Sequence, residues 1–85
     1  MPYNSKITGE VLRSLRVRRR LSQEIVSGLA GMARSHLAMI ESGTVNTTIA
    51  TLWRIAEAMN MRLSEIILLI EDAHEKEMLT HSNEK

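Results

Sequence analysis

No side chains in this chain stand in the patterns that catalysis or metal binding requires. The sequence has no cysteine, and its three histidines, His36, His74 and His81, lack the spacing of metal ligands. His74 is near Glu71 and Glu77 in the sequence, and we expect it on a solvated helix face. Nucleophile elbows, phosphate loops and paired catalytic carboxylates are also missing from the sequence. We therefore expect a protein that is not an enzyme and that uses no metal or cofactor.

Charge divides the chain into two unlike halves. Residues 1–45 carry seven basic and three acidic side chains, a net charge of +4, whereas residues 46–85 carry four and seven, a net charge of −3. A basic half suits a polyanionic partner, although it could also be a solvated face with no partner. The first ten residues lack the apolar run of a signal peptide, and the run 66–70 is too short to span a bilayer. These features predict a cytoplasmic protein with no membrane partner.

Helical periodicity runs through most of the 85 residues. It predicts an all-α fold, a compact five-helix bundle with helices over about 8–19, 22–30, 33–42, 48–59 and 65–77. Thr8 is expected to cap the first of these helices. We expect one domain over residues 6–79, with flexible termini at 1–5 and 80–85.

The stretch 22–42 has the pattern of two short helices joined by a tight turn. Ser22 is a good N-cap for the first helix, and Gly31 allows the positive φ that ends it. Gly43 ends the second helix in the same way. Two short helices around such a turn are typical of a helix-turn-helix. Ile25, Val26, Leu29 and Ala30 supply apolar positions at helical spacing in the first helix, and Leu37 and Ile40 are expected to face inward in the second. In the helix expected over 48–59, the apolar stripe is Ile49, Leu52, Ile55, Ala56 and Met59.

The helix expected over 65–77 is apolar over a wider arc than a surface helix needs. One face suits the core of the domain, but Leu69 and Ala73 widen it and Leu68 lies nearly opposite. Exposed apolar surface usually marks a partner site, so we expect a homodimer interface here. The alternative is a helix that lies deeper in a single core. The residues expected in the dimer interface are Ile66, Leu68, Leu69 and Ala73.

Residues 9–67 resemble the helix-turn-helix domains of phage repressors and of bacterial regulators of the xenobiotic-response-element type. The markers of this resemblance are Leu15-Arg16, Leu21-Ser22-Gln23-Glu24, Gly31, Ile40-Glu41-Ser42-Gly43, Asn46 and the run Leu52…Ile55-Ala56…Met59. It implies a bacterial or phage DNA-binding protein whose second motif helix enters the major groove. Residues 34–37 and 40–43 further resemble the controller proteins of restriction–modification systems, which are small and dimeric.

The resemblance implies that base edges are contacted from the start of the second motif helix. The matching positions are Ala33, Arg34 and Ser35, with Ala38 and Met39 one turn further on. Arg34 can bond both O6 and N7 of guanine, and Ser35 can bond a base or a phosphate, whereas Ala38 and Met39 offer apolar contact. A cation at a helix start opposes the helix dipole, so a nearby anion would explain Arg34. The alternative is an exposed arginine without a partner.

The resemblance also implies contacts to the DNA backbone. The residues placed there are Gln23, His36, Thr44, Asn46, Thr47 and Arg20. The loop that contains the threonines has no basic residue, unlike that of some relatives, so attraction to phosphate must come from amides, hydroxyls and the first helix. Arg20 stands where relatives often have a glycine, which implies either a differently built turn or local strain.

Arg16 and Glu41 resemble the internal ion pair of the family, which joins the first helix to the end of the second motif helix. If the pair is buried, breaking it should cost about 3–5 kcal/mol, whereas a surface pair would contribute little.

Together these features predict a sequence-specific regulator of transcription, such as a repressor, that binds double-stranded DNA as a homodimer on a near-palindromic operator and associates with the nucleoid. One alternative is an antitoxin that also represses its own promoter and binds a toxin partner, because residues 46–49 resemble those of some antitoxins. A second alternative is a structural helical adaptor with an incidental basic half.

Overall fold

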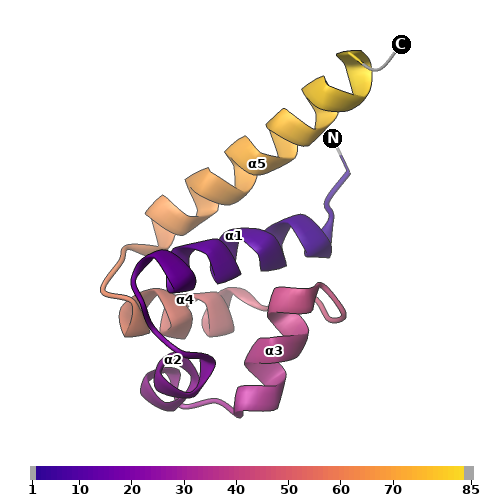
Figure 1. The fold of residues 1–85 in the computed structure, drawn as a ribbon. Helices are drawn as coiled ribbons and strands as arrows, with labels where there is room; N and C mark the ends of the chain where they lie inside the picture. Colours follow the sequence, from indigo (N-terminus) through magenta and orange to yellow (C-terminus); the bar gives the residue numbers. More distant parts are fainter. Residues whose placement is uncertain (1, 84–85) are drawn as a thin grey trace.

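Five helices make up the described part of the chain, residues 2–83, in the computed structural model (Figure 1). They are α1 (Ser5–Arg18), α2 (Gln23–Ala30), α3 (Arg34–Ser42), α4 (Ile49–Ala58) and α5 (Leu63–Asn83), and these residues contain no strand. Helix α1 lies between α5 on one side and the α2–α4 layer on the other, and the C-terminal part of α5 projects beyond the body. The expected all-α, five-helix fold is confirmed.

Capping residues begin α2, and end α2 and α3, where the sequence predicts. The Ser22 hydroxyl accepts a hydrogen bond from the Ile25 N–H at 3.1 Å, which satisfies a free amide of the first turn of α2. Gly31 and Gly43 follow α2 and α3 with φ of +68° and +78°, a conformation that suits glycine because it has no Cβ. The turn between the two motif helices is therefore set by residues within it.

Helix α1 begins earlier than the sequence predicts. Asn4 caps it in place of Thr8, since the Asn4 side-chain oxygen accepts from the Lys6 N–H at 2.9 Å. Thr8 therefore lies inside the helix, where it is buried and its hydroxyl has no hydrogen-bond partner among the described residues.

His74 contacts the start of the chain, which corrects the expectation that it lies on a solvated helix face. Its side chain is only 6% exposed, not solvated, and its Nε2 accepts a hydrogen bond from the Asn4 N–H at 3.0 Å. Its Nδ1 lies 2.7 Å from the Ile70 carbonyl, to which it donates, and its ring stacks on Tyr3. Tyr3 and Asn4 thus contact α5 through His74. Residue 1 and residues 84–85, also expected to be flexible, lie outside the described residues, and α5 itself continues to Asn83.

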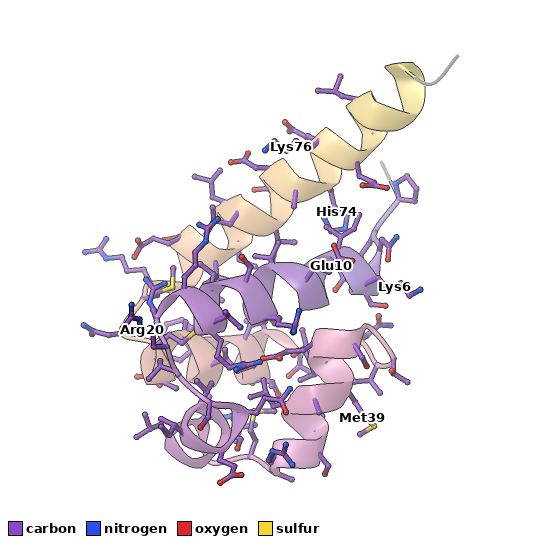
Figure 2. All side chains as sticks on the ribbon, in the orientation of Figure 1. Lys6, Glu10, Arg20, Met39, His74 and Lys76 are labelled. Atoms are coloured by element: carbon purple, nitrogen blue, oxygen red, sulfur yellow. The ribbon has the colours of Figure 1, made fainter. Side chains whose placement is uncertain are left out.

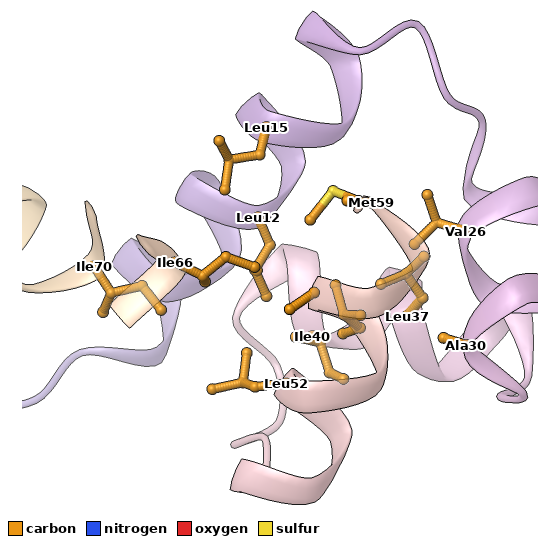
Figure 3. Packing of buried hydrophobic residues seen from close by; sticks show 12 residues of the cluster. Leu12, Leu15, Val26, Ala30, Leu37, Ile40, Leu52, Met59, Ile66 and Ile70 are labelled. Carbon is orange, nitrogen blue, oxygen red and sulfur yellow. The ribbon is translucent and has the colours of Figure 1, made fainter. Parts of the chain in front are cut away.

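The core lies where the five helices meet. Figure 3 shows Leu12 of α1, Ile40 of α3, Leu52 of α4 and Ile66 of α5 gathered in one cluster. Its buried hydrophobic residues are Leu12, Leu15, Val26, Ala30, Leu37, Ile40, Leu52, Ile55, Ala56, Met59, Ile66 and Ile70. Three of the apolar residues predicted at helical spacing are exposed, namely Ile25, Leu29 and Ile49. They lie on flanks of α2 and α4 that no neighbouring helix covers, with Leu29 67% exposed.

Candidate nucleic-acid interface

Helix α3 is held against α1 by a very close approach of the two backbones at Gly9. A Cβ atom at Gly9 would lie 2.5 Å from the Ile40 carbonyl oxygen and closer still to that of Glu41. No side chain larger than hydrogen fits there unless the helices separate. Gly9 was not expected to have a role, because nothing in its sequence neighbourhood indicates which helix will cross it.

A buried ion pair fixes the same two helices further along. Arg16 Nε and Nη2 donate to the two carboxylate oxygens of Glu41 at 2.7 and 2.9 Å, and the side chains are 11% and 3% exposed. Arg16 Nη1 also donates to the Leu21 carbonyl at 2.9 Å, and Gln23 Nε2 donates to Glu41 at 3.0 Å. The hydrogen bond to Glu41 raises the pKa of Arg16 above the ordinary arginine value, although burial alone would lower it. One carboxylate thus ties α1, α2 and α3 together.

The outward side of α3 is largely exposed in the described part of the chain. Ala33, Arg34 and Ser35 are exposed at its start, and Ala33 provides no side-chain cap. One turn further, Ala38 is half-buried and Met39 is exposed, and Met39 projects away from the body in Figure 2. The five residues expected to contact bases therefore lie at the N-cap and in the first two turns of α3.

The loop after α3 carries polar groups close to the end of that helix. Thr44 and Asn46 are exposed, Thr47 is half-buried, and the Ser42 and Thr44 hydroxyls lie 2.6 Å apart. The Thr48 hydroxyl caps α4 by accepting from the Thr51 N–H. The hydroxyls expected to face phosphate are therefore grouped beside α3.

Comparisons with known proteins agree with this geometry. A family described as helix-turn-helix matches residues 12–66, which is more than half of the chain. The chain belongs to the helix-turn-helix family. It is also 31% identical over 62 residues to the HTH-type transcriptional regulator y4dJ of Sinorhizobium fredii, a match that covers 73% of this chain and 80% of that protein.

Two solved structures extend the comparison. The restriction–modification controller protein C.AhdI of Aeromonas hydrophila is 31% identical, with a TM-score of 0.71, and the match covers 73% of this chain and 94% of that one. The clp gene regulator ClgR of Corynebacterium glutamicum has a TM-score of 0.87 over 95% of this chain and 86% of that one, but at 14% identity this likeness shows the fold alone. The expected resemblance to phage-repressor-like regulators is confirmed, and the chain is a DNA-binding transcriptional regulator, not an enzyme.

Two of the residues of this helix-turn-helix protein that are expected at the DNA backbone, Gln23 and Arg20, have structural features that bear on this role. Gln23 donates one amide hydrogen to Glu41, so the side chain has a structural role and retains one free N–H at most for a phosphate. Arg20 has a φ of +56°, so the turn does carry a strained residue in a glycine-like conformation. Figure 2 shows Arg20 on the opposite side of the molecule from Met39.

The helix-turn-helix protein presents apolar surface on both flanks of α5. Leu68, 58% exposed, lines a groove of about 860 Å³ between α4 and α5 together with Trp53 and Met61. Leu69, 40% exposed, and half-buried Ala73 line a second groove between α1 and α5. Ile66 has no exposed surface, because it packs in the core of its own protomer, and it cannot face a second copy. The expected dimer residues thus belong to the core and to two separate grooves.

None of the described helices has the length and apolar character needed to cross a membrane. Among the described residues, no group of three or more histidine, cysteine, aspartate or glutamate side chains could hold a metal ion.

Proposed function

We propose that this helix-turn-helix regulator binds a near-palindromic operator in double-stranded DNA as a homodimer and acts as a restriction–modification controller protein. The observation that carries the proposal is the exposed start of α3, with Arg34 and Ser35 free on a helix that is tied to α1 and α2 through Glu41. A rigid support behind a free polar surface is what base recognition needs, because contacts to base edges depend on fixed geometry.

In this proposal Arg34 makes the discriminating contact, with guanine O6 and N7 as acceptors. Arg34→Ala should weaken binding to the operator by about 1–3 kcal/mol and relax the preference at one base pair. The measurement is a binding selection on random-sequence DNA with the parent and the variant. If both proteins select the same sequence, Arg34 does not contact a base.

Backbone contacts are assigned to Gln23, His36, Thr44, Asn46 and Thr47. They lie at the start of α2, in the first turn of α3 and in the loop after α3, where the resemblance to phage repressors implies contacts to phosphate. Thr44→Val should weaken binding about equally on all duplexes, since phosphate carries no sequence information. A loss confined to one operator sequence would contradict this role.

The dimer is supported by the exposed apolar side chains of α5, such as Leu68 and Leu69, because exposed apolar patches mark partner sites. Substitutions at two exposed leucines can distinguish between the two grooves, since Leu68 lines the α4–α5 groove and Leu69 lines the α1–α5 groove. Sedimentation of Leu68→Glu and Leu69→Glu shows which groove is the interface: the variant that becomes monomeric identifies it. If both variants remain dimeric, the interface lies elsewhere.

The controller assignment rests on the 31% identity to C.AhdI, which covers 94% of that protein. A methyltransferase gene and an endonuclease gene beside the coding sequence would support it. No observation favours the antitoxin alternative, because the relatives reported above are described as regulators or as a controller protein. Co-purification with an unrelated chain would revive that alternative.

A further inference from the structure

The first turn of α1 packs directly on the glycine that ends α3. A Cβ atom at Gly43 would lie 2.6 Å from both Cα and Cγ of Lys6, so these two residues are in contact along their backbones. The Ser5 hydroxyl donates to the Gly43 carbonyl at 2.8 Å and holds the contact from the other side. Lys6 is thereby placed beside the loop whose hydroxyls are assigned to the DNA backbone.

The side chain of Lys6 is free and faces the proposed DNA side. It is exposed, and it makes no hydrogen bond or ion pair with the described residues. Figure 2 shows Lys6 and Met39 projecting from the same side of the molecule, whereas Arg20 projects from the opposite side. The first helix therefore turns its N-terminal lysine, and not Arg20 beyond its C-terminal end, toward the surface that carries α3.

The loop between α3 and α4 has no positive charge of its own. Residues 43–48, Gly-Thr-Val-Asn-Thr-Thr, have no basic side chain, so their hydroxyls and amides have no cation of their own to attract phosphate. The ammonium group of Lys6, on a neighbouring helix, is the cation that the fold brings to this place.

We propose that Lys6 binds a phosphate of the DNA backbone beside the end of α3, an inference that rests on the proposed function. The residue was not expected from the sequence, because it is 28 positions from Arg34 and lies outside the helix-turn-helix stretch. Its backbone is held at three points before DNA arrives: the Asn4 side chain accepts from the Lys6 N–H, Ser5 bonds Gly43, and the Asn4 N–H bonds His74. Only the lysine side chain must be ordered on binding, which keeps the entropic cost small.

The test is the salt dependence of DNA binding by the full chain, measured by fluorescence anisotropy between about 50 and 200 mM salt. The probes are a duplex selected from random DNA by the parent protein and an unrelated duplex. The logarithm of the binding constant falls linearly with the logarithm of the salt concentration, and each phosphate contact adds about 0.9 to the steepness of this line. The line for Lys6→Gln should therefore be shallower than that of the parent by about 0.9. With equal affinities of the parent and the variant at 1 M salt as the reference, a difference of 0.9 in slope makes the affinity of Lys6→Gln about eightfold lower than that of the parent at 0.1 M salt, on both duplexes.

Two matched variants complete the experiment. Lys6→Arg keeps the positive charge and should retain the parent slope. Lys76→Gln removes one positive charge from α5, away from α3, and should also leave the slope unchanged. Circular dichroism establishes that Lys6→Gln is folded. A Lys6→Gln slope equal to that of the parent overturns the inference and leaves the proposed function standing. A parent that binds neither duplex refutes both.

Discussion

The ion pair between Arg16 and Glu41 offers a quantitative test of how α3 is held. Both side chains are nearly buried, and two charge-assisted hydrogen bonds of 2.7 and 2.9 Å join them. Arg16→Met removes the guanidinium and leaves the Glu41 carboxylate, 3% exposed, with only the Gln23 amide as a donor. An unpaired buried charge costs about 3–5 kcal/mol. For a domain of this size, that shifts the melting temperature down by roughly 12–40 °C, at about 4–8 °C per kcal/mol.

The partner variant should cost less. Glu41→Leu leaves the Arg16 guanidinium with the Leu21 carbonyl and with its greater share of solvent, and we expect a loss of about 2–3 kcal/mol. The double variant Arg16→Met/Glu41→Leu replaces the pair by apolar side chains of similar size. It should lie within about 1–2 kcal/mol of the parent, because no charge remains to be desolvated.

Urea denaturation followed by circular dichroism gives the three free energies of unfolding, and the double-mutant cycle gives the coupling between the two residues. We expect a coupling of at least about 2 kcal/mol. Arg13→Met, an exposed arginine of the same helix, is the control and should change stability by no more than about 0.5 kcal/mol. Additive single losses, with a coupling below about 0.5 kcal/mol, would refute the view that this pair is a buried tie between α1 and α3.

Three other predictions concern backbone and packing, all measured as free energies of unfolding. Gly9→Ala should destabilise the fold by about 3 kcal/mol because it forces α1 away from α3. Gly28→Ala, with nothing within 4 Å of the added Cβ, should stabilise α2 by about 0.5–1 kcal/mol. Equal effects of the two variants would contradict the close approach of α1 and α3 at Gly9. Thr8→Val removes a buried hydroxyl that has no partner among the described residues and should stabilise the fold by about 1 kcal/mol, so a loss of stability would reveal a hidden bond. Arg20→Gly should relieve about 0.5–1 kcal/mol at φ +56°, and Asn60→Gly, at the same φ, should gain less, since asparagine tolerates that conformation.

Features that depend on near neighbours in the chain were predictable. Ser22 caps α2, and Gly31 and Gly43 end α2 and α3, because each residue acts within one turn of its own position. The inward positions of Leu37 and Ile40 followed from helical spacing. The family markers pointed to the Arg16–Glu41 pair, whose side chains are 11% and 3% exposed in the structure.

Periodicity alone could not decide how far a neighbouring helix covers each face. Ile25, Leu29 and Ile49 share flanks with core residues yet remain in solvent. Leu68 and Leu69 are adjacent in the sequence and 100° apart on the helix, so only the packing of α4 and α1 shows that they line different grooves.

The sequence by itself determined the helices, the turn between the motif helices and the residues at the start of α3. Tertiary structure alone decided that Gly9 lets α3 rest on α1, that His74 faces inward onto Asn4, and that Lys6 lies beside Gly43. The physical reason is range: caps and turns act over four or five residues, whereas these contacts join residues 31 to 70 positions apart, which only helix packing brings together.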